Sequence, residues 1–156
     1  MDKSELEGNS HAHSRVDDCR IVRLERFGSL EGTLCVVENG ATSPLGYDVK
    51  RVYYLFDMPS DTSRGGHSHH SCIETLTAVA GSFEVRVSDG VRERVFVLRQ
   101  PWECLLIPAG IWRTLENFSS GAVCLVMASE EFNESDYVRS PQEFATLTRQ
   151  KCIEKM

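Results

Sequence analysis

Hydrophobic and polar residues alternate along most of the chain after Cys19, in short runs that end at turn signals. The runs are CRIVRLERF, GTLCVVENG, DVKRVYYLFD, ETLTAVAGSFEVRVSDG, RERVFVL, WECLLIPAG, IWRTLENF and AVCLVMAS. They are rich in β-branched and aromatic residues, which favours strands. Turns are expected at Gly28, Asn39-Gly40, Ala80-Gly81 and Asp89-Gly90. The pattern therefore predicts an all-β sandwich or barrel.

The N-terminal stretch does not share this pattern. Residues 1–18, MDKSELEGNSHAHSRVDD, are polar and lack the apolar core of a signal peptide. They predict a flexible tail, followed by a single domain over residues 19–156 that is long enough to bury a core. The pair His11 and His13 has nothing to position it in such a tail, so we interpret it as solvated rather than as a metal site.

The C-terminal stretch SPQEFATLTRQKCIEKM has the pattern of a helix. Ser140 fits the N-cap and Pro141 the first helical position, and a glutamate follows at the capping-box position. We expect one helical face to be buried through Phe144, Leu147 and Ile153.

The composition of the chain excludes some classes of function. The net charge is −6, from 23 acidic against 17 basic residues, which argues against a general nucleic-acid binder. No apolar stretch is long enough to span a bilayer, so we expect a cytoplasmic protein without a membrane partner. The six cysteines are scattered without a C-x-x-C motif and are expected to be free thiols, several of them buried.

The stretch RGGHSHH holds the chain's most informative chemistry. His67 and His69 lie two residues apart, so on a strand they point to the same face. Glu74 follows closely. Such a group can be part of a metal site or part of a proton-transfer site, and the spacing alone does not decide between them.

Two stretches resemble the paired signatures of the cupins. The first signature, H-x-H followed by E and then G, matches from His67 to Gly81 after its opening glycine. The second, P-x-G followed by H and then N, matches at Pro108, Gly110 and Asn117. This resemblance implies a cupin jelly-roll β-barrel, to which the chain adds a short C-terminal helix.

The second signature departs from the cupin pattern at Arg113, where cupins have the histidine that is the fourth metal ligand. A guanidinium stays protonated and has no lone pair for a metal. His67, His69 and Glu74 could still form a three-ligand site for a divalent metal. Alternatively, two imidazoles and a guanidinium suit an anionic substrate or an enolate.

Over Cys19 to Phe144 the chain resembles the nucleotide-sugar 3,4-ketoisomerases, most strongly in KRVYY, RGGHSHH and SEEFNESDYVR. It departs from them at Gly66, where members usually have a bulky aromatic, and at Glu74, where Gln is common. The resemblance implies that the protein converts a dTDP-4-keto-6-deoxyhexose to its 3-keto isomer, ahead of a 3-aminotransferase. It implies no cofactor, and a homodimer formed through the strand CRIVRLERF.

Moving a ketone from C4 to C3 requires removal of the C3 proton, delivery of a proton to C4 and an enediol intermediate. Histidine is a suitable base near neutral pH. The resemblance makes His67 the base at C3 and His69 the group that relays or donates the second proton, with Tyr53 hydrogen-bonding the sugar or joining the proton relay. The residues expected to bind the substrate are Arg51, Arg64, Trp112 and Arg113.

Other functions stay open at this point. One is a metal-dependent cupin, a dioxygenase or an isomerase, that uses His67, His69 and Glu74. Another is a non-catalytic cupin that binds nucleotide sugars. At the residue level, Glu74 could be a metal ligand or a hydrogen-bond partner of a histidine. The sequence suggests no chemical role for Asp136, Tyr137 and Arg139.

Overall fold

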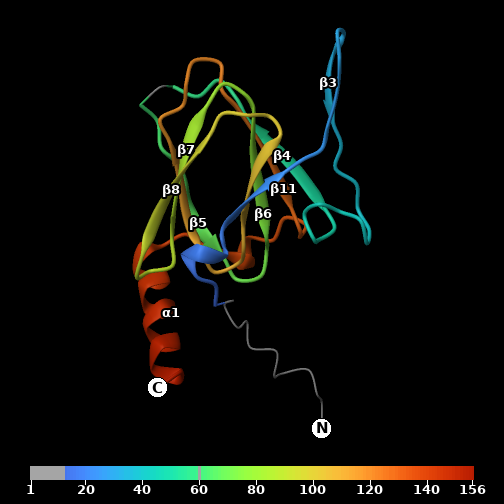
Figure 1. Cartoon of the computed structure of the whole chain (residues 1–156). Coiled ribbons are helices and arrows are strands. Elements are labelled where there is room, and N and C mark those ends of the chain that lie inside the picture. Colours follow the sequence, from blue (N-terminus) through green and yellow to red (C-terminus); the bar gives the residue numbers. More distant parts are fainter. Residues whose placement is uncertain (1–12, 60) are drawn as a thin grey trace.

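The computed structural model describes residues 13–59 and 61–156, and these form two five-stranded antiparallel sheets that face each other (Figure 1). The first sheet has the order β1 (Arg20–Arg23), β9 (Glu103–Ile107), β6 (Glu74–Ala80), β11 (Val123–Ala128), β4 (Arg51–Leu55). The second has the order β12 (Tyr137–Val138), β5 (Arg64–His69), β10 (Trp112–Glu116), β7 (Phe83–Ser88), β8 (Glu93–Leu98). The predicted all-β jelly roll is confirmed.

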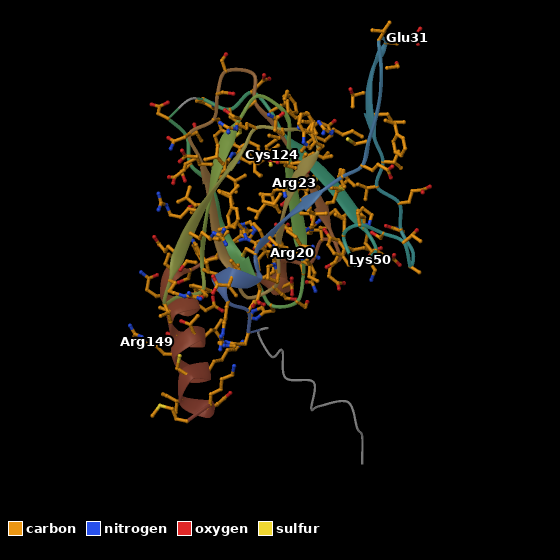
Figure 2. The ribbon with its side chains drawn as sticks, viewed as in Figure 1. Arg20, Arg23, Glu31, Lys50, Cys124 and Arg149 are labelled. Carbon is orange, nitrogen blue, oxygen red and sulfur yellow. The ribbon has the colours of Figure 1, made fainter. Side chains whose placement is uncertain are left out.

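The main core fills the space between the two sheets. Alternate residues of β7, such as Phe83 and Val85, meet inward residues of β11 such as Cys124 and Val126. Cys124 is labelled inside the barrel in Figure 2. A smaller core lies elsewhere, where Leu45 packs with residues that include Leu106 and Met127. The interior of the barrel is therefore closed by packed side chains except where polar residues replace them.

A separate two-stranded hairpin, β2 (Arg26–Ser29) and β3 (Gly32–Cys35), stands away from the barrel, with Glu31 at its tip (Figures 1 and 2). The turn expected at Gly28 is wrong, because this glycine lies within β2 and pairs with Thr33. The turns expected at Ala80-Gly81 and Asp89-Gly90 are confirmed, since β6 and β7 end there.

The fold begins earlier than the sequence indicated. Val16–Asp18 form a short 3-10 helix, and Val16 is buried in the main core with 3% exposure. The packed core therefore includes a residue before Cys19. Residues 1–12, with His11 of the H-x-H pair, lie outside the described residues.

The C-terminal helix α1 (Pro141–Glu154) begins as predicted, since the Ser140 hydroxyl accepts a hydrogen bond from the backbone N–H of Glu143 at 3.2 Å. Phe144 is buried against β10, but Ile153 is 72% exposed, so its expected burial is wrong. The reason is that the second half of the helix projects beyond the barrel (Figure 1).

None of the helices within residues 13–59 and 61–156 has the length and apolar character needed to cross a membrane. All six cysteines are free, as expected, and four of them are buried: Cys19, Cys72, Cys104 and Cys124.

Candidate active site

Polar side chains replace the apolar core in one part of the barrel and surround a cavity of about 340 Å³. Both sheets contribute to its walls. The residues lining it are Arg51, Tyr53, Leu55, Arg64, Gly65, His67, Glu74, Leu76, Arg113, Leu115, Val126, Phe132, Tyr137 and Arg139. Most of the site residues expected from the sequence are therefore brought together here.

Strand pairing explains how residues distant in sequence meet at this cavity. In the second sheet Arg113 of β10 lies directly opposite His67 of β5. In the first sheet Ala128 of β11 has Arg51 of β4 on one side and Glu74 of β6 on the other. Alternation along β4 then turns Tyr53 into the cavity as well.

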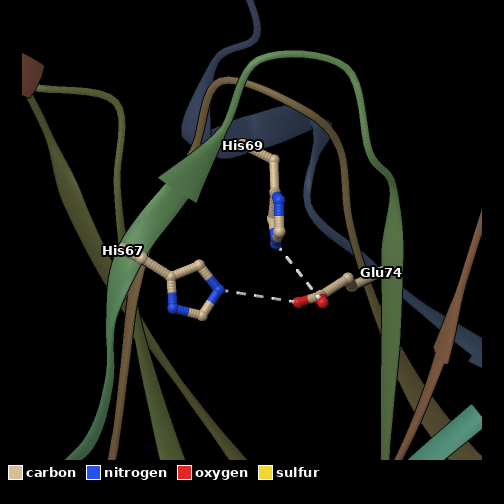
Figure 3. Close-up of side chains that lie close together, drawn as sticks. All are labelled: His67, His69 and Glu74. Atoms are coloured by element: carbon tan, nitrogen blue, oxygen red, sulfur yellow. Dashed lines mark ion pairs between the residues drawn. The ribbon is translucent and has the colours of Figure 1, made fainter. Parts of the chain in front are cut away.

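Glu74 lies at the centre of the polar side chains of the site and contacts several of them. One carboxylate oxygen accepts a hydrogen bond from the Tyr53 hydroxyl at 2.8 Å and lies 3.3 Å from Nε2 of His69. The other accepts a hydrogen bond from Nη1 of Arg113 at 2.7 Å and lies 4.0 Å from Nε2 of His67. Figure 3 shows both imidazoles pointing from β5 toward the carboxylate of Glu74, which lies on β6 of the facing sheet.

The charge of Glu74 is fixed by these neighbours. Burial alone would raise its pKa, but the adjacent His69, the charge of Arg113 and the hydrogen bond from Tyr53 together hold the pKa well below its usual value. Burial raises the pKa of Tyr53, and the adjacent Glu74 carboxylate raises it further. Near neutral pH the site therefore contains a carboxylate, a neutral phenol and a guanidinium.

His67 has the features of a general base. Its Nδ1 lies 3.1 Å from the carbonyl oxygen of Gly65, which can only accept, so the proton of the neutral ring is on Nδ1. Nε2 then carries the lone pair and is buried without a hydrogen-bond partner in the described part of the chain. Burial and then the charge of Arg113 lower the pKa of His67 to about 3. The imidazole is therefore neutral and able to accept a proton.

His69 does not line the cavity, so it is not placed to donate a proton directly to the substrate there, and its expected role as a proton relay stays a prediction. It is only 1% exposed and lies behind Glu74, with Nδ1 3.1 Å from Oδ2 of Asp136. The ring of Tyr137 packs on it with centroids 4.3 Å apart. A substrate in the cavity would contact His67, Glu74 and Tyr137 before it could reach His69.

Trp112 does not line the cavity either, and its expected role in binding the substrate stays a prediction. It is next to Arg113 on β10, and alternation turns it to the opposite face, where its ring packs on Phe144 of α1 with centroids 5.4 Å apart. Arg64 does line the cavity and is exposed at its edge.

The structure adds residues that sequence reasoning left without a role. Tyr137 lines the cavity and accepts a hydrogen bond from Arg51 at 3.2 Å. Arg139 lines it too and stacks over the ring of Tyr137. Asp136 lies behind it. All three belong to the recognised stretch SEEFNESDYVR, but only the pairing of β12 with β5 shows that this stretch reaches the site.

The donor set can be tested for a metal. His67, His69 and Glu74 offer ligand atoms that lie within 4.8 Å of one another. However, Nη1 of Arg113 is 2.7 Å from a Glu74 oxygen, so a guanidinium already neutralises the carboxylate and would repel a cation beside it. The arrangement therefore suits proton transfer better than metal binding.

The chain is similar in sequence and in structure to known proteins. Residues 17–149 match the family model described as "FdtA: WxcM-like, C-terminal". A TDP-4-oxo-6-deoxy-α-D-glucose-3,4-oxoisomerase of Aneurinibacillus thermoaerophilus is 29% identical over 136 residues, 87% of this chain and 96% of that protein.

Two solved structures are also similar. A 3,4-ketoisomerase from Helicobacter canadensis has a TM-score of 0.81 and 32% identity, covering 85% of this chain and 98% of the other. A sugar 3,4-ketoisomerase from Thermoanaerobacterium thermosaccharolyticum, in complex with TDP, has a TM-score of 0.83 and 28% identity, covering 87% and 98%. The chain therefore belongs to the FdtA family, and over most of its length it is similar to sugar 3,4-ketoisomerases.

Proposed function

We propose that this protein is a sugar 3,4-ketoisomerase that converts a TDP-linked 4-keto-6-deoxyhexose into its 3-keto isomer by proton transfer. Two independent lines support this function. The relatives act on TDP-4-oxo-6-deoxyglucose or bind TDP, as their names state. The observation that carries the proposal is the neutral His67, whose unpartnered Nε2 faces the site beside Arg113 and Glu74.

The first step removes the proton from C3. Nε2 of His67 takes this proton, the C3–H electrons form a C3=C4 double bond, and the C4 carbonyl electrons move onto its oxygen. Positive charge from Arg113 and Arg51 stabilises the resulting enolate oxygen, and Tyr53 adds a hydrogen bond when its hydroxyl proton turns from Glu74 to that oxygen. These groups are held in place before the substrate binds, because Glu74 fixes both Arg113 and Tyr53.

The second step completes the isomerisation. The C4 oxygen takes up a proton while the hydroxyl on C3 gives one up, so the net transfer is from O3 to O4. The C3–O electrons then form the ketone, and the C3=C4 electrons take a proton at C4. Since His69 does not line the cavity, we assign the proton at C4 to a group of the cavity wall. His67 can return the proton that it removed, and Tyr53 is the other proton-bearing group that faces the cavity at Glu74.

The diphosphate of the substrate requires cationic groups at the edge of the cavity. Arg64 and Arg139 are exposed and line it from β5 and from the residues after β12. Guanidinium groups bind phosphate oxygens in bidentate fashion, which suits them to this role. We propose that they hold the diphosphate while the sugar reaches His67.

The product defines the next reaction. A 3-keto sugar is the compound that a 3-aminotransferase needs, so the proposed reaction prepares a 3-amino-3,6-dideoxyhexose. We place it in the cytoplasm, because the six cysteines are free and the nucleotide-linked substrate requires no membrane.

The test is product formation by protein treated with chelator. With TDP-4-keto-6-deoxyglucose, we expect conversion to the 3-keto sugar without added metal. Tight binding of TDP without conversion would instead indicate a non-catalytic binding cupin. Conversion only after a divalent metal is restored would indicate a metal-dependent enzyme that uses His67, His69 and Glu74.

We also propose that the protein is a homodimer, in which the β2–β3 hairpin of each copy packs on the other copy. Phe27 and Leu34 face each other across this hairpin and are 53% and 59% exposed. Tyr54, 61% exposed, faces outward on β4, the edge strand of the first sheet. An isolated hairpin is marginally stable in water, so these apolar surfaces favour a partner.

Light scattering after gel filtration tests the dimer. We expect twice the monomer mass for the wild type and monomer mass for Leu34→Lys. The control is Val91→Lys, because Val91 is 79% exposed in the turn between β7 and β8. A wild-type monomer at micromolar concentration would contradict the proposal.

A further inference from the structure

The most informative group outside the cavity is a chain of side chains behind it. Asp136 contacts Nδ1 of His69 at 3.1 Å, and Nε2 of His69 contacts Glu74 at 3.3 Å. The same Glu74 oxygen accepts the hydrogen bond from Tyr53 at 2.8 Å. The chain thus runs from Asp136 to the hydroxyl that faces the substrate.

Asp136 is itself held firmly. Its Oδ1 accepts hydrogen bonds from the backbone N–H of Ser71 at 2.9 Å and from the Ser71 hydroxyl at 2.7 Å. Its Oδ2, the oxygen that faces His69, also accepts from the backbone N–H of Cys72 at 3.1 Å. The carboxylate is 8% exposed and cannot turn without breaking several of these bonds.

The backbone brings Asp136 to this place. Tyr137 of β12 pairs with His69 of β5, and the N–H of His70 donates to the carbonyl of Asp136 at 2.9 Å. Asp136, the last residue of a 3-10 helix (Glu134–Asp136), therefore lies directly before the strand that pairs with His69.

His69 faces a carboxylate oxygen at each ring nitrogen. Both neighbours are carboxylates, which can only accept, so His69 donates to Asp136 and to Glu74 together when both of its nitrogens carry a proton, and the two carboxylates then fix the orientation of the ring from both sides. The ring has no room to move, because Tyr137 packs on it and it is 1% exposed.

We propose, resting on the function above, that Asp136 is a positioning residue for the isomerisation. Through His69 it holds the Glu74 carboxylate in the position that fixes Tyr53 and Arg113 at the cavity wall. Neither Asp136 nor His69 touches the substrate. Their effect is on the turnover step, since the groups that they orient stabilise the enolate, and not on binding of the nucleotide.

The competing explanation is that Asp136 only anchors the turn at Ser71 and Cys72. Two variants separate the explanations. Asp136→Asn keeps the shape of the side chain but removes the charge and one acceptor that faces His69. Ser71→Ala removes only the hydroxyl bond to the other oxygen, which weakens the anchor and leaves the contact with His69 in place.

The experiment measures kcat and KM with TDP-4-keto-6-deoxyglucose, the Kd for TDP and the melting temperature. For Asp136→Asn we expect kcat to fall at least about tenfold, with KM and Kd within about twofold of wild type. Ser71→Ala is expected to keep nearly full activity. Equal activity loss in both variants, or a parallel loss of affinity and melting temperature, would overturn the proposal.

A double-mutant cycle tests the route through His69. His69→Gln is expected to lower kcat with unchanged Kd for TDP, and adding Asp136→Asn is expected to lower it little further, because both changes break the same chain. Additive losses would refute the route. The single variant His69→Gln keeps the proposal testable if Asp136→Asn does not fold, since a loss of TDP binding there would also refute it.

The two proposals fail in different ways. A wild-type protein that binds TDP but forms no 3-keto product refutes the proposed function, and this inference with it. A wild-type protein that forms the product while Asp136→Asn is equally active refutes only the role of Asp136.

Discussion

His67 combines three properties that a base at C3 needs, and each has a local cause. Strand β5 turns it inward, the carbonyl of Gly65 fixes its tautomer, and burial beside Arg113 keeps it neutral. Because Arg113 is its neighbour in the β-ladder, the group that lowers the proton affinity of His67 also faces the developing enolate.

The substitution His67→Asn removes the base while keeping a polar side chain. We expect kcat to fall about 10²- to 10⁴-fold, the usual contribution of general base catalysis, with a small change in KM. Steady-state kinetics with TDP-4-keto-6-deoxyglucose measures both. His70→Asn is the matched control, because β5 ends before His70 and this residue does not line the cavity. A variant at position 67 with activity near wild type would exclude His67 as the base.

The pairs of His67 with Glu74 and of Arg51 with Tyr53 could be predicted from the sequence, because alternation and the motif spacing place them on inward faces. The depth of His69 could not, since a strand pattern gives the face of a residue and not what lies in front of it. Asp136 was missed because it comes directly before a two-residue strand, β12, whose pairing with β5 brings it to the site. So short a strand has no periodic signal.

At the scale of elements, the turn between β6 and β7 shows why the cupin motif requires a glycine. Gly81 has φ of +64°, and a Cβ there would lie 2.5 Å from Oγ of Ser119 and 2.8 Å from Cα of Ala122. Both the backbone conformation and the close approach of the chain after β10 therefore exclude a side chain.

Gly81→Ala is expected to destabilise the fold by more than Gly121→Ala. Gly121 also has a positive φ, +72°, but nothing lies within 4 Å of its Cβ position. Gly121→Ala, the control, should therefore lower the free energy of unfolding only by the cost of the left-handed conformation, about 1–2 kcal/mol. Gly81→Ala should lower it by that amount and by the cost of the steric clash as well. Urea unfolding compares them. Equal losses of unfolding free energy in the two variants would show that the close approach of Ser119 and Ala122 to Gly81 does not affect stability.

In helix α1 the burial predicted from the sequence can be compared with the burial in the structure at two residues. Its helical period predicted burial of both Phe144 and Ile153, but only Phe144 meets the barrel, because the helix continues past the end of β10. A sequence period shows which residues share a face and does not show how far the partner surface extends.

Phe144→Ala is expected to lower the free energy of unfolding by about 3–5 kcal/mol, the usual cost of removing a buried aromatic ring. Ile153→Ala should change it by less than about 0.5 kcal/mol, because Ile153 is 72% exposed. Neither side chain lines the cavity, so turnover per folded molecule should be unchanged. A similar loss in the two variants would place Ile153 in an interface.

At the scale of the whole molecule, the site makes stability depend on pH. The pKa of His67 is lowered from 6.5 to about 3, so between these values the unfolded chain binds a proton that the folded protein does not. The pKa of Glu74 is also lowered, so its contribution is present above 4.5 and is lost as the pH falls further. Both groups therefore destabilise the fold as the solution becomes acidic.

The contribution of His67 can be isolated by comparing wild type with His67→Asn. Between pH 6.5 and 4.5 we expect the wild type to lose up to about 1.4 kcal/mol more per pH unit than the variant. Urea unfolding at several pH values measures this slope. Parallel slopes for the two proteins would mean that His67 is protonated in the folded state.

The fold could be predicted as a whole because each strand carries its own alternation and turn signals, and the cupin motifs fixed how the strands meet. The position of the projecting hairpin could not be predicted, since Phe27 and Leu34 lie in alternating runs like those of the barrel strands. In the single chain they are exposed, which is the reason to expect a second copy.

The most direct test of proton transfer by His67 is proton NMR in heavy water, with chelator-treated protein and TDP-4-keto-6-deoxyglucose. We predict that the C3 proton signal disappears as the 3-keto product forms, and that it persists with His67→Asn. Retention of the C3 proton by the wild type until a divalent metal is added would contradict the account and make His67, His69 and Glu74 metal ligands.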